Sequence, residues 1–187
     1  MAKPAPRRMS LAEFLEWDDG SDLRYELIAG EPVAMAPPLF GHAIVVSNLD
    51  RLIGSRLKSP CLIMAGAGVA ASESASSYLV PDLVVTCEPV DPRGRYLTTP
   101  RLIVEILSPT TSMRDRMIKQ GEYRAIASLE ELVYVAPLER RVQLWRRHAD
   151  HWRVYDLIGE AELRLESLGV TIPLAAIYQN LALDDGP

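Results

Sequence analysis

The fold of this chain is decided by two apolar stretches: YLVPDLVVT at residues 78–86 and RLIVEIL at residues 101–107. Stretches that are apolar at nearly every position predict β-strands that are covered on both faces. Each stretch carries one acid, Asp82 in the first and Glu105 in the second. A carboxylate among apolar side chains destabilises the fold by several kcal/mol unless a positive charge compensates it. Two such acids on consecutive core strands suggest a shared cation, with structural salt bridges as the alternative.

A lysine downstream is predicted to face the same strands. Residues 112–129 have the pattern of a helix, with Ser112 and Asp115 as its start signal. At about 100° per residue, Lys119 falls on the same side as Tyr123, among the apolar residues that must cover the sheet. Seventeen of the 20 basic residues are arginine, so an inward lysine, with its compact ammonium, is unusual in this chain. The alternative is a helix ion pair between Lys119 and Asp115.

Further elements can be predicted outward from this core. They are a short helix at 11–17 after a capping box that begins at Ser10, a β-hairpin formed by 24–28 and 31–35, a long helix at 40–57, strands at 61–65 and 67–71, strands at 131–136, 141–146 and 151–158, and a short helix opened by Pro173. We interpret this order as a single domain of the α/β or α+β class over residues 10–183, preceded by a flexible N-terminal arm at residues 1–9.

Composition narrows the class of protein. The chain has 187 residues, of which 48% are hydrophobic, and a net charge of −5. These values fit a globular domain and argue against a broad surface that coats nucleic acid. No apolar run reaches the roughly 18 residues of a membrane span, and Glu13 and Glu16 interrupt any signal-peptide core. Cys61 and Cys87 form neither a disulfide framework nor a CxxC pair, so we expect a cytoplasmic, reducing environment.

Other motifs give weaker signals. Residues 66–71 read GAGVAA and, with Glu88 downstream, match a dinucleotide-binding fingerprint, but the segment after them is too short and serine-rich for a phosphate-binding helix. We therefore expect a Gly/Ala-rich strand pair there. His148 and His151 could chelate zinc from a helix, but they lie in a predicted hairpin turn. A GxSxG motif is absent from the sequence, which argues against a nucleophilic hydrolase.

Arginines gather near the C-terminal strands, at Arg140, Arg141, Arg146 and Arg147. Such a run could form a local basic stripe. The simpler interpretation is a solvated face of exposed strands.

The strand-borne acids and the nearby lysine resemble the PD-(D/E)xK pattern of metal-dependent nucleases. Leu107 stands where the lysine of that pattern is expected. More specifically, over about residues 10–183, the chain resembles the Uma-two family of restriction-type endonucleases, in which the lysine lies on the following helix. The matching pieces are Tyr25-Glu26-Leu-Ile, Gly30, Met35, Pro37, His42, Pro81-Asp82-Leu-Val-Val, Val104-Glu105-Ile-Leu-Ser108-Pro109-Thr-Thr, Asp115, Lys119 and Tyr123. The family's usual Glu-Tyr-Trp is here Glu131-Leu132-Val133, a departure that concerns packing more than chemistry.

This resemblance implies a restriction-endonuclease-like α/β core. Its mixed β-sheet would be flanked by the helices at 40–57 and 112–127, with an extra N-terminal β-hairpin and C-terminal antiparallel strands. The implied reaction is Mg²⁺-dependent hydrolysis of phosphodiester bonds in nucleic acid, DNA being the expected substrate, with Mn²⁺ as a substitute ion.

The resemblance also implies roles for particular residues. Asp82 and Glu105 would hold the metal with the backbone carbonyl of Ile106, Glu26 would be a further candidate ligand, and Lys119 would support the attacking water or the transition-state charge. The supporting residues would be His42, Asp115 and Tyr123. The acidic net charge fits either a nuclease with a narrow basic groove or a domain that depends on a homodimer or another partner for its affinity for the substrate. The alternative function is a catalytically silent binding or assembly module with a nuclease fold.

Overall fold

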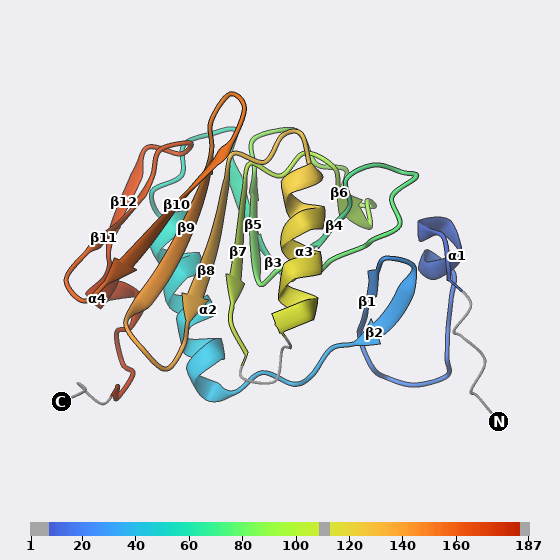
Figure 1. The fold of residues 1–187 in the computed structure, drawn as a ribbon, viewed down its shortest axis with the longest axis horizontal. Coiled ribbons are helices and arrows are strands. Elements are labelled where there is room, and N and C mark those ends of the chain that lie inside the picture. The colour runs from blue at the N-terminus through green and yellow to red at the C-terminus, as the bar shows by residue number, and fades with distance from the viewer. Residues whose placement is uncertain (1–7, 109–112, 184–187) are drawn as a thin grey trace.

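The computed structural model describes residues 8–108 and 113–183, the side chains of 113–115 excepted. Its centre is a six-stranded sheet with the strand order β10-β9-β8-β7-β5-β3 (Figure 1). The bounds are β3 Leu62–Ala65, β5 Leu83–Thr86, β7 Leu102–Ile106, β8 Glu131–Ala136, β9 Arg141–Arg147 and β10 Trp152–Ile158. In this sheet β7 and β8 are parallel, and the other neighbouring strands are antiparallel. The predicted mixed sheet is therefore confirmed.

Two helices cover opposite faces of this sheet: α2 (Phe40–Gly54) lies behind it in Figure 1 and α3 (Met113–Ala125) in front. Successive residues of a strand point to opposite faces. Val104 accordingly belongs to the core on the α2 side, and its neighbour Ile103 belongs to the core on the α3 side. We call these the α2-side core and the α3-side core. Burial on both faces explains why the central strands are apolar at nearly every position.

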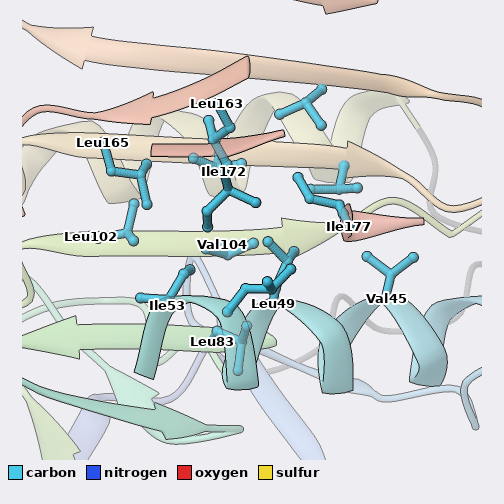
Figure 2. Packing of buried hydrophobic residues seen from close by; sticks show 14 of the residues in the cluster. Val45, Leu49, Ile53, Leu83, Leu102, Val104, Leu163, Leu165, Ile172 and Ile177 are labelled. Atoms are coloured by element: carbon cyan, nitrogen blue, oxygen red, sulfur yellow. The ribbon is translucent and has the colours of Figure 1, made fainter. Parts of the chain in front are cut away.

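The α2-side core is closed by a C-terminal layer that the sequence analysis only partly anticipated. This layer consists of β11 (Glu162–Leu165), β12 (Val170–Pro173) and α4 (Leu174–Ile177). Figure 2 shows Leu163 and Ile172 of this layer next to Val104 of β7. Leu49 of α2 belongs to the same core and lies below Val104 in this view. The short helix after Pro173 was predicted, whereas the β11–β12 hairpin was not.

The α3-side core also includes residues of the hairpin of β1 (Tyr25–Ile28) and β2 (Glu31–Ala34) and of the short parallel pair of β4 (Gly68–Val69) and β6 (Tyr96–Leu97). The short helix α1 (Leu11–Leu15) contacts Tyr78 through Phe14. The hairpin turns at Ala29 and Gly30, whose φ angles are 51° and 84°. Both are left-handed, as a tight two-residue turn requires. The predicted hairpin and the capping box at Ser10 are confirmed. Residues 1–7 of the expected N-terminal arm lie outside the described residues, as does the predicted helix-start residue Ser112.

The strand predicted over residues 78–86 is shorter than expected. Regular pairing begins at Leu83, while Tyr78 and Leu79 form isolated bridges to Leu27 and Val69. Pro81 has no N–H group and cannot donate to a ladder. Asp82 therefore lies directly before β5 rather than inside it.

Cys61 and Cys87 form a disulfide, a pairing that was not predicted from the sequence. Cys61 directly precedes β3, and Cys87 directly follows β5. The antiparallel register pairs Leu62 with Thr86, so one further step brings the two cysteines opposite each other. This pairing depends on strand register, which the spacing of two cysteines in a sequence does not reveal.

Three weaker motifs can now be placed. Gly68 begins β4 and packs against the ring of Tyr78, as the strand interpretation of residues 66–71 predicted, and no helix follows within the described residues until α3. His148 and His151 stack in the turn between β9 and β10, with the His148 amide donating to the His151 carbonyl at 2.8 Å. No helix among the described residues is long and apolar enough to cross a membrane.

The solvated interpretation of the arginine run is wrong for two of its members. Arg146 pairs with the buried carboxylate of Glu131 at 2.8 Å. Arg147 donates to the carbonyls of Ile126 and Leu129, at 2.7 and 2.6 Å, in the turn that follows α3. These guanidinium groups satisfy buried acceptors instead of forming a free basic stripe, whereas Arg141 is exposed as expected.

Candidate active site

Asp82 and Glu105 lie close together where β5 and β7 part. The ladder between β5 and β7 ends at the pair of Leu83 and Val104, so Asp82 and Glu105 are the next residues on the two segments, and the charge of Asp82 acts on Glu105. Glu105 points to the α3 side, as Ile103 does two residues earlier on β7, whereas Asp82, directly before β5, contacts His42 of α2. The side chains of Asp82 and Glu105 are 20% and 13% exposed. Two like charges that lie close together and are mostly buried destabilise a fold, so this arrangement needs a compensating group.

Glu105 is only partly compensated by its surroundings. The Tyr123 hydroxyl donates a hydrogen bond to its Oε1, and the Lys119 ammonium lies 3.7 Å from the same oxygen. Burial raises the pKa of Glu105 to about 7, and the negative charges of Asp82 and Glu26 act in the same direction, against Lys119 and Tyr123. Near neutral pH, this carboxyl group is therefore poised between its protonated and ionised forms.

Lys119 points inward from α3, as the helix pattern predicted, but its principal partner is Glu26 on β1. Its Nζ lies 2.8 and 2.7 Å from the two Glu26 oxygens. Glu26 is itself fixed by the amide of Val80, which donates to Oε1 at 2.8 Å. Burial lowers the pKa of Lys119, but the carboxylates of Glu105 and Glu26 outweigh this effect, so the net shift is upward. Lys119 is thus a charged ammonium held between two acids.

Asp82 is held in place by two donors. The His42 Nε2 atom, from the first turn of α2, lies 3.0 Å from Oδ1, and the Ile106 amide donates to Oδ2 at 2.7 Å. The hydrogen bond to Asp82 raises the pKa of His42, although burial opposes it. The Ile106 backbone therefore lies beside Asp82 through its amide, while the role of its carbonyl as a ligand stays a prediction. The side chain of Asp115 is outside the described residues.

The donor set is chemically suited to a hard cation. Within the described parts of the chain, no group of three or more His, Cys, Asp or Glu side chains is arranged to hold a metal ion. Mg²⁺, however, is commonly bound by only one or two carboxylates and keeps several waters. Asp82 and Glu105 supply two such groups, and their mutual repulsion would be relieved by a divalent ion between them. The residues therefore fit a carboxylate-and-water metal site.

Two neighbours of this site were missed by sequence reasoning. Tyr134 on β8 is the register partner of Glu105, and the Arg116 guanidinium lies 4.7 Å from the centre of the Tyr134 ring. A signal was present: Arg116 stands one turn before Lys119 on the same helix, and tyrosine is the one polar residue inside ELVYVA, apart from the glutamate that opens it.

The weaker motifs of the sequence add no side chain to this group. His148 and His151 lie in the turn between β9 and β10, where they stack on each other. Gly66 meets the site through the backbone, since its amide donates to the Asp82 carbonyl at 3.0 Å. This contact positions the chain before β5 and brings no further functional group to the acids.

Comparisons with known proteins agree with this architecture. The family model Uma2, described as "Putative restriction endonuclease", matches residues 11–175. Two relatives come from Synechocystis. "Uncharacterized protein slr1290" is 28% identical over 96% of this chain and 95% of its own length. "Uncharacterized protein sll1609" is 30% identical over 81% of this chain and 89% of its own length. The crystal structure of a putative nuclease belonging to DUF820 from Anabaena variabilis has a TM-score of 0.72 at 19% identity, over 91% of this chain and 97% of that one. The fold is restriction-endonuclease-like, as expected.

Proposed function

Since this chain belongs to the Uma2 family, we propose that it is a divalent-metal-dependent endonuclease that hydrolyses phosphodiester bonds of nucleic acid. The observation that carries this proposal is the pair of neighbouring acids, Asp82 and Glu105, whose charges act on each other, with Lys119 at 3.7 Å from Glu105. A fold that keeps two like charges close together and mostly buried loses stability unless a cation belongs there.

In this proposal Asp82 and Glu105 hold the metal, Mg²⁺ being the expected ion and Mn²⁺ a substitute, and the Ile106 carbonyl is a candidate further ligand. A bound Mg²⁺ would polarise the phosphate and lower the pKa of an attacking water. Lys119 would donate to an oxygen on which negative charge develops, an effect typically worth about 10²–10³ in rate. Because Glu26 already holds the Lys119 ammonium in position, the site needs little reorganisation when that charge develops.

The remaining contacts support a positioning role for the neighbouring residues. Both Glu26 oxygens are engaged by Lys119, and Oε1 also accepts from Val80, so Glu26 is better suited to orienting Lys119 than to binding the metal. Tyr123 would orient Glu105, and His42 would orient Asp82.

The test is a cleavage assay. Purified protein is incubated with Mg²⁺ or Mn²⁺ and with single-stranded, duplex and branched DNA and RNA. We expect cleavage that EDTA abolishes, and its loss in Asp82→Asn and in Glu105→Gln. The two defects should not add, because both remove one site. Glu88→Gln, which neutralises an exposed acid beyond the other end of β5, is the matched control and should cut as the wild type does.

One observation favours the alternative, a catalytically silent binding module. Both Asp82 oxygens already accept hydrogen bonds from the protein, which could satisfy the carboxylate without a metal. Thermal melting distinguishes the two functions. A catalytic site predicts that Mg²⁺ or Mn²⁺ raises the melting temperature of the wild type but not of Asp82→Asn. Equal melting curves with and without metal, together with no cleavage, would favour the silent module.

A further inference from the structure

A small cavity adjoins the proposed metal site. Its volume is about 160 Å³. It is lined by Leu107, Arg116, Tyr134, Ala136, Glu139, Arg141 and Gln143. Tyr134 is the register partner of Glu105, and Leu107 lies two residues beyond Glu105 along the chain. The cavity is therefore beside the reaction centre, on the flank of α3 that faces β8 and β9.

The wall of this cavity contains a polar group that the described protein leaves unsatisfied. Tyr134 is only 2% exposed, yet its hydroxyl has no hydrogen-bond partner among the described residues. A buried hydroxyl without a partner typically destabilises a protein by about 1–3 kcal/mol. Such groups are uncommon in folded proteins and call for an explanation, for example a ligand that is absent from the structure.

Arg116 supplies a cation at the same wall. Its guanidinium lies over the Tyr134 ring, and its Nη2 donates to Gln143 Oε1 at 3.2 Å. The same oxygen accepts from Trp145 Nε1 at 2.8 Å. Gln143 thus holds the guanidinium in place while occupying only one of its five N–H donors. An oriented arginine with spare donors is well suited to phosphate recognition.

We propose that this cavity is a subsite for a phosphate group of the nucleic acid backbone, next to the phosphate that is cut, with Arg116 and Tyr134 as its donors. The inference rests on the proposed function, because it assigns the ligand from the neighbouring reaction centre. A backbone phosphate matches a cation and a neutral hydroxyl donor side by side. Contacts of this kind fix the register of a strand without reading its sequence.

Charged residues at the rim of the cavity weaken its attraction for phosphate. Arg141 lies there, but it is paired with Asp156 at 3.6 Å. The exposed Glu139 adds a negative charge that repels phosphate. Two opposite effects follow: loss of Arg116 or of the Tyr134 hydroxyl weakens binding, and neutralisation of Glu139 strengthens it.

The experiment measures binding separately from cleavage. Fluorescence anisotropy of a labelled single-stranded thymidine oligonucleotide is recorded in EDTA over a range of salt concentrations. We expect Arg116→Gln to weaken affinity by about 10- to 100-fold and Tyr134→Phe by about 3- to 10-fold. For Arg116→Gln, the slope of the logarithm of affinity against the logarithm of salt concentration should also be less steep by about 0.7. This is the contribution of one phosphate contact to single-stranded nucleic acid.

Two further variants complete the design. Glu139→Gln should bind about 2- to 3-fold more tightly at low salt only, since it changes an exposed charge. Arg164→Gln removes the same charge as Arg116→Gln, but from β11 on the opposite side of the sheet, and should bind as the wild type does. Thermal melting of each variant establishes that it is folded, and Tyr134→Phe is close enough in shape to preserve packing.

The outcomes separate this inference from the proposed function. If the wild type binds the oligonucleotide and Arg116→Gln and Tyr134→Phe bind it as Arg164→Gln does, the subsite is refuted whether or not the enzyme cuts. Absence of any wild-type binding also refutes it. If the expected binding losses occur but the wild type cuts nothing in Mg²⁺ or Mn²⁺, the subsite stands and the nuclease proposal fails.

Discussion

Two glutamates on neighbouring strands, Glu131 and the partly buried Glu105, have different partners around their carboxylates. Glu131, at the start of β8, lies on the α2 side and is fully buried. Its oxygens accept from Arg146 Nε at 2.8 Å, from the Ser167 hydroxyl at 2.5 Å, and from the amides of Glu166 and Ser167. Glu105, at the end of β7, lies on the α3 side with Tyr123 and a more distant ammonium.

This contrast shows what distinguishes a structural acid from a candidate functional one. Burial alone does not, because Glu131 is the more buried of the two. Glu131 has one guanidinium and a full set of donors, so it is satisfied by the protein. Glu105 shares a single nearby lysine with Glu26 and lies near Asp82, and burial together with these acids raises its pKa to about 7. An incompletely neutralised group of acids is where a cation is expected.

The largest effect is expected on the Glu131 side. Glu131→Ala would leave the partly buried Arg146 guanidinium without its buried partner and remove four hydrogen bonds. We predict a loss of about 3–5 kcal/mol in the free energy of unfolding, measured by urea denaturation. Glu166→Ala is the matched control: its carboxylate contacts the same Arg146 but is 68% exposed, so it should cost less than about 1 kcal/mol. Equal losses in the two variants would mean that burial does not determine how much an ion pair with Arg146 contributes to the free energy of unfolding.

Lys119→Arg tests the opposite side. A guanidinium keeps the charge but is too large to occupy the space between Glu26 and Glu105 in the same way. We predict a folded protein that still gains thermal stability from Mg²⁺ but cuts nucleic acid about 10²–10³-fold more slowly. Lys58→Arg, at an exposed position, should cut normally. Near-wild-type cleavage by Lys119→Arg would remove this lysine from the catalytic set.

Much of the fold could be predicted because its patterns are local. Continuous apolar runs identified β5, β7 and β8, and the helical spacing alone gave the inward direction of Lys119. The β11–β12 hairpin was missed, although Leu163 and Leu165 alternate with exposed residues as in a half-buried strand. The pattern is only four residues long and lies among polar residues, so it gives a weak signal.

The pairings within the site could not be predicted, for a different reason. Lys119 and Glu26 are 93 residues apart, and nothing local to either residue identifies the other. The contact of His42 with Asp82 likewise depends on where α2 begins relative to β5. Which residues meet across a sheet depends on strand register and on helix placement, and both are properties of the whole fold.

Glu105→Gln tests the electrostatic side of the comparison through pH. The folded-state pKa of Glu105, about 7, is raised above its ordinary value of 4.5. The wild type therefore loses stability as the pH rises through this window, because ionisation is costlier in the folded protein. A neutral glutamine avoids that loss.

We predict that, in EDTA, Glu105→Gln matches the wild type at about pH 4.5 and is about 2–3 kcal/mol more stable at about pH 8. Thermal melting at a series of pH values measures this. The raised pKa of His42 adds a loss of the same sign in both proteins, and this loss should be smaller in Glu105→Gln, because the charge of Glu105 contributes to the raised His42 pKa. A difference that does not change with pH would contradict the raised pKa.

The smallest effect is expected for Tyr123→Phe. The ring of Tyr123 is fully buried in the α3-side core, and its hydroxyl contacts Glu105. This hydrogen bond favours the ionised carboxylate and holds the Glu105 pKa lower than it would otherwise be. Removing it should therefore raise that pKa further and cost about 1 kcal/mol at about pH 8, with a smaller cost at about pH 5.

Tyr178→Phe provides the matched comparison on the α2 side. The Tyr178 hydroxyl donates to the carbonyl of Arg141 at 2.8 Å, a neutral acceptor, so the cost of its loss should be the same at both pH values. For a chain of this size, about 1 kcal/mol corresponds to a change of about 2–4 °C in melting temperature, which is measurable. If Tyr123→Phe also showed a pH-independent loss, its hydroxyl would serve packing alone. Glu105 would then be held by Lys119 without help from the core, and the distinction between the two glutamates would rest on charge rather than on the number of donors.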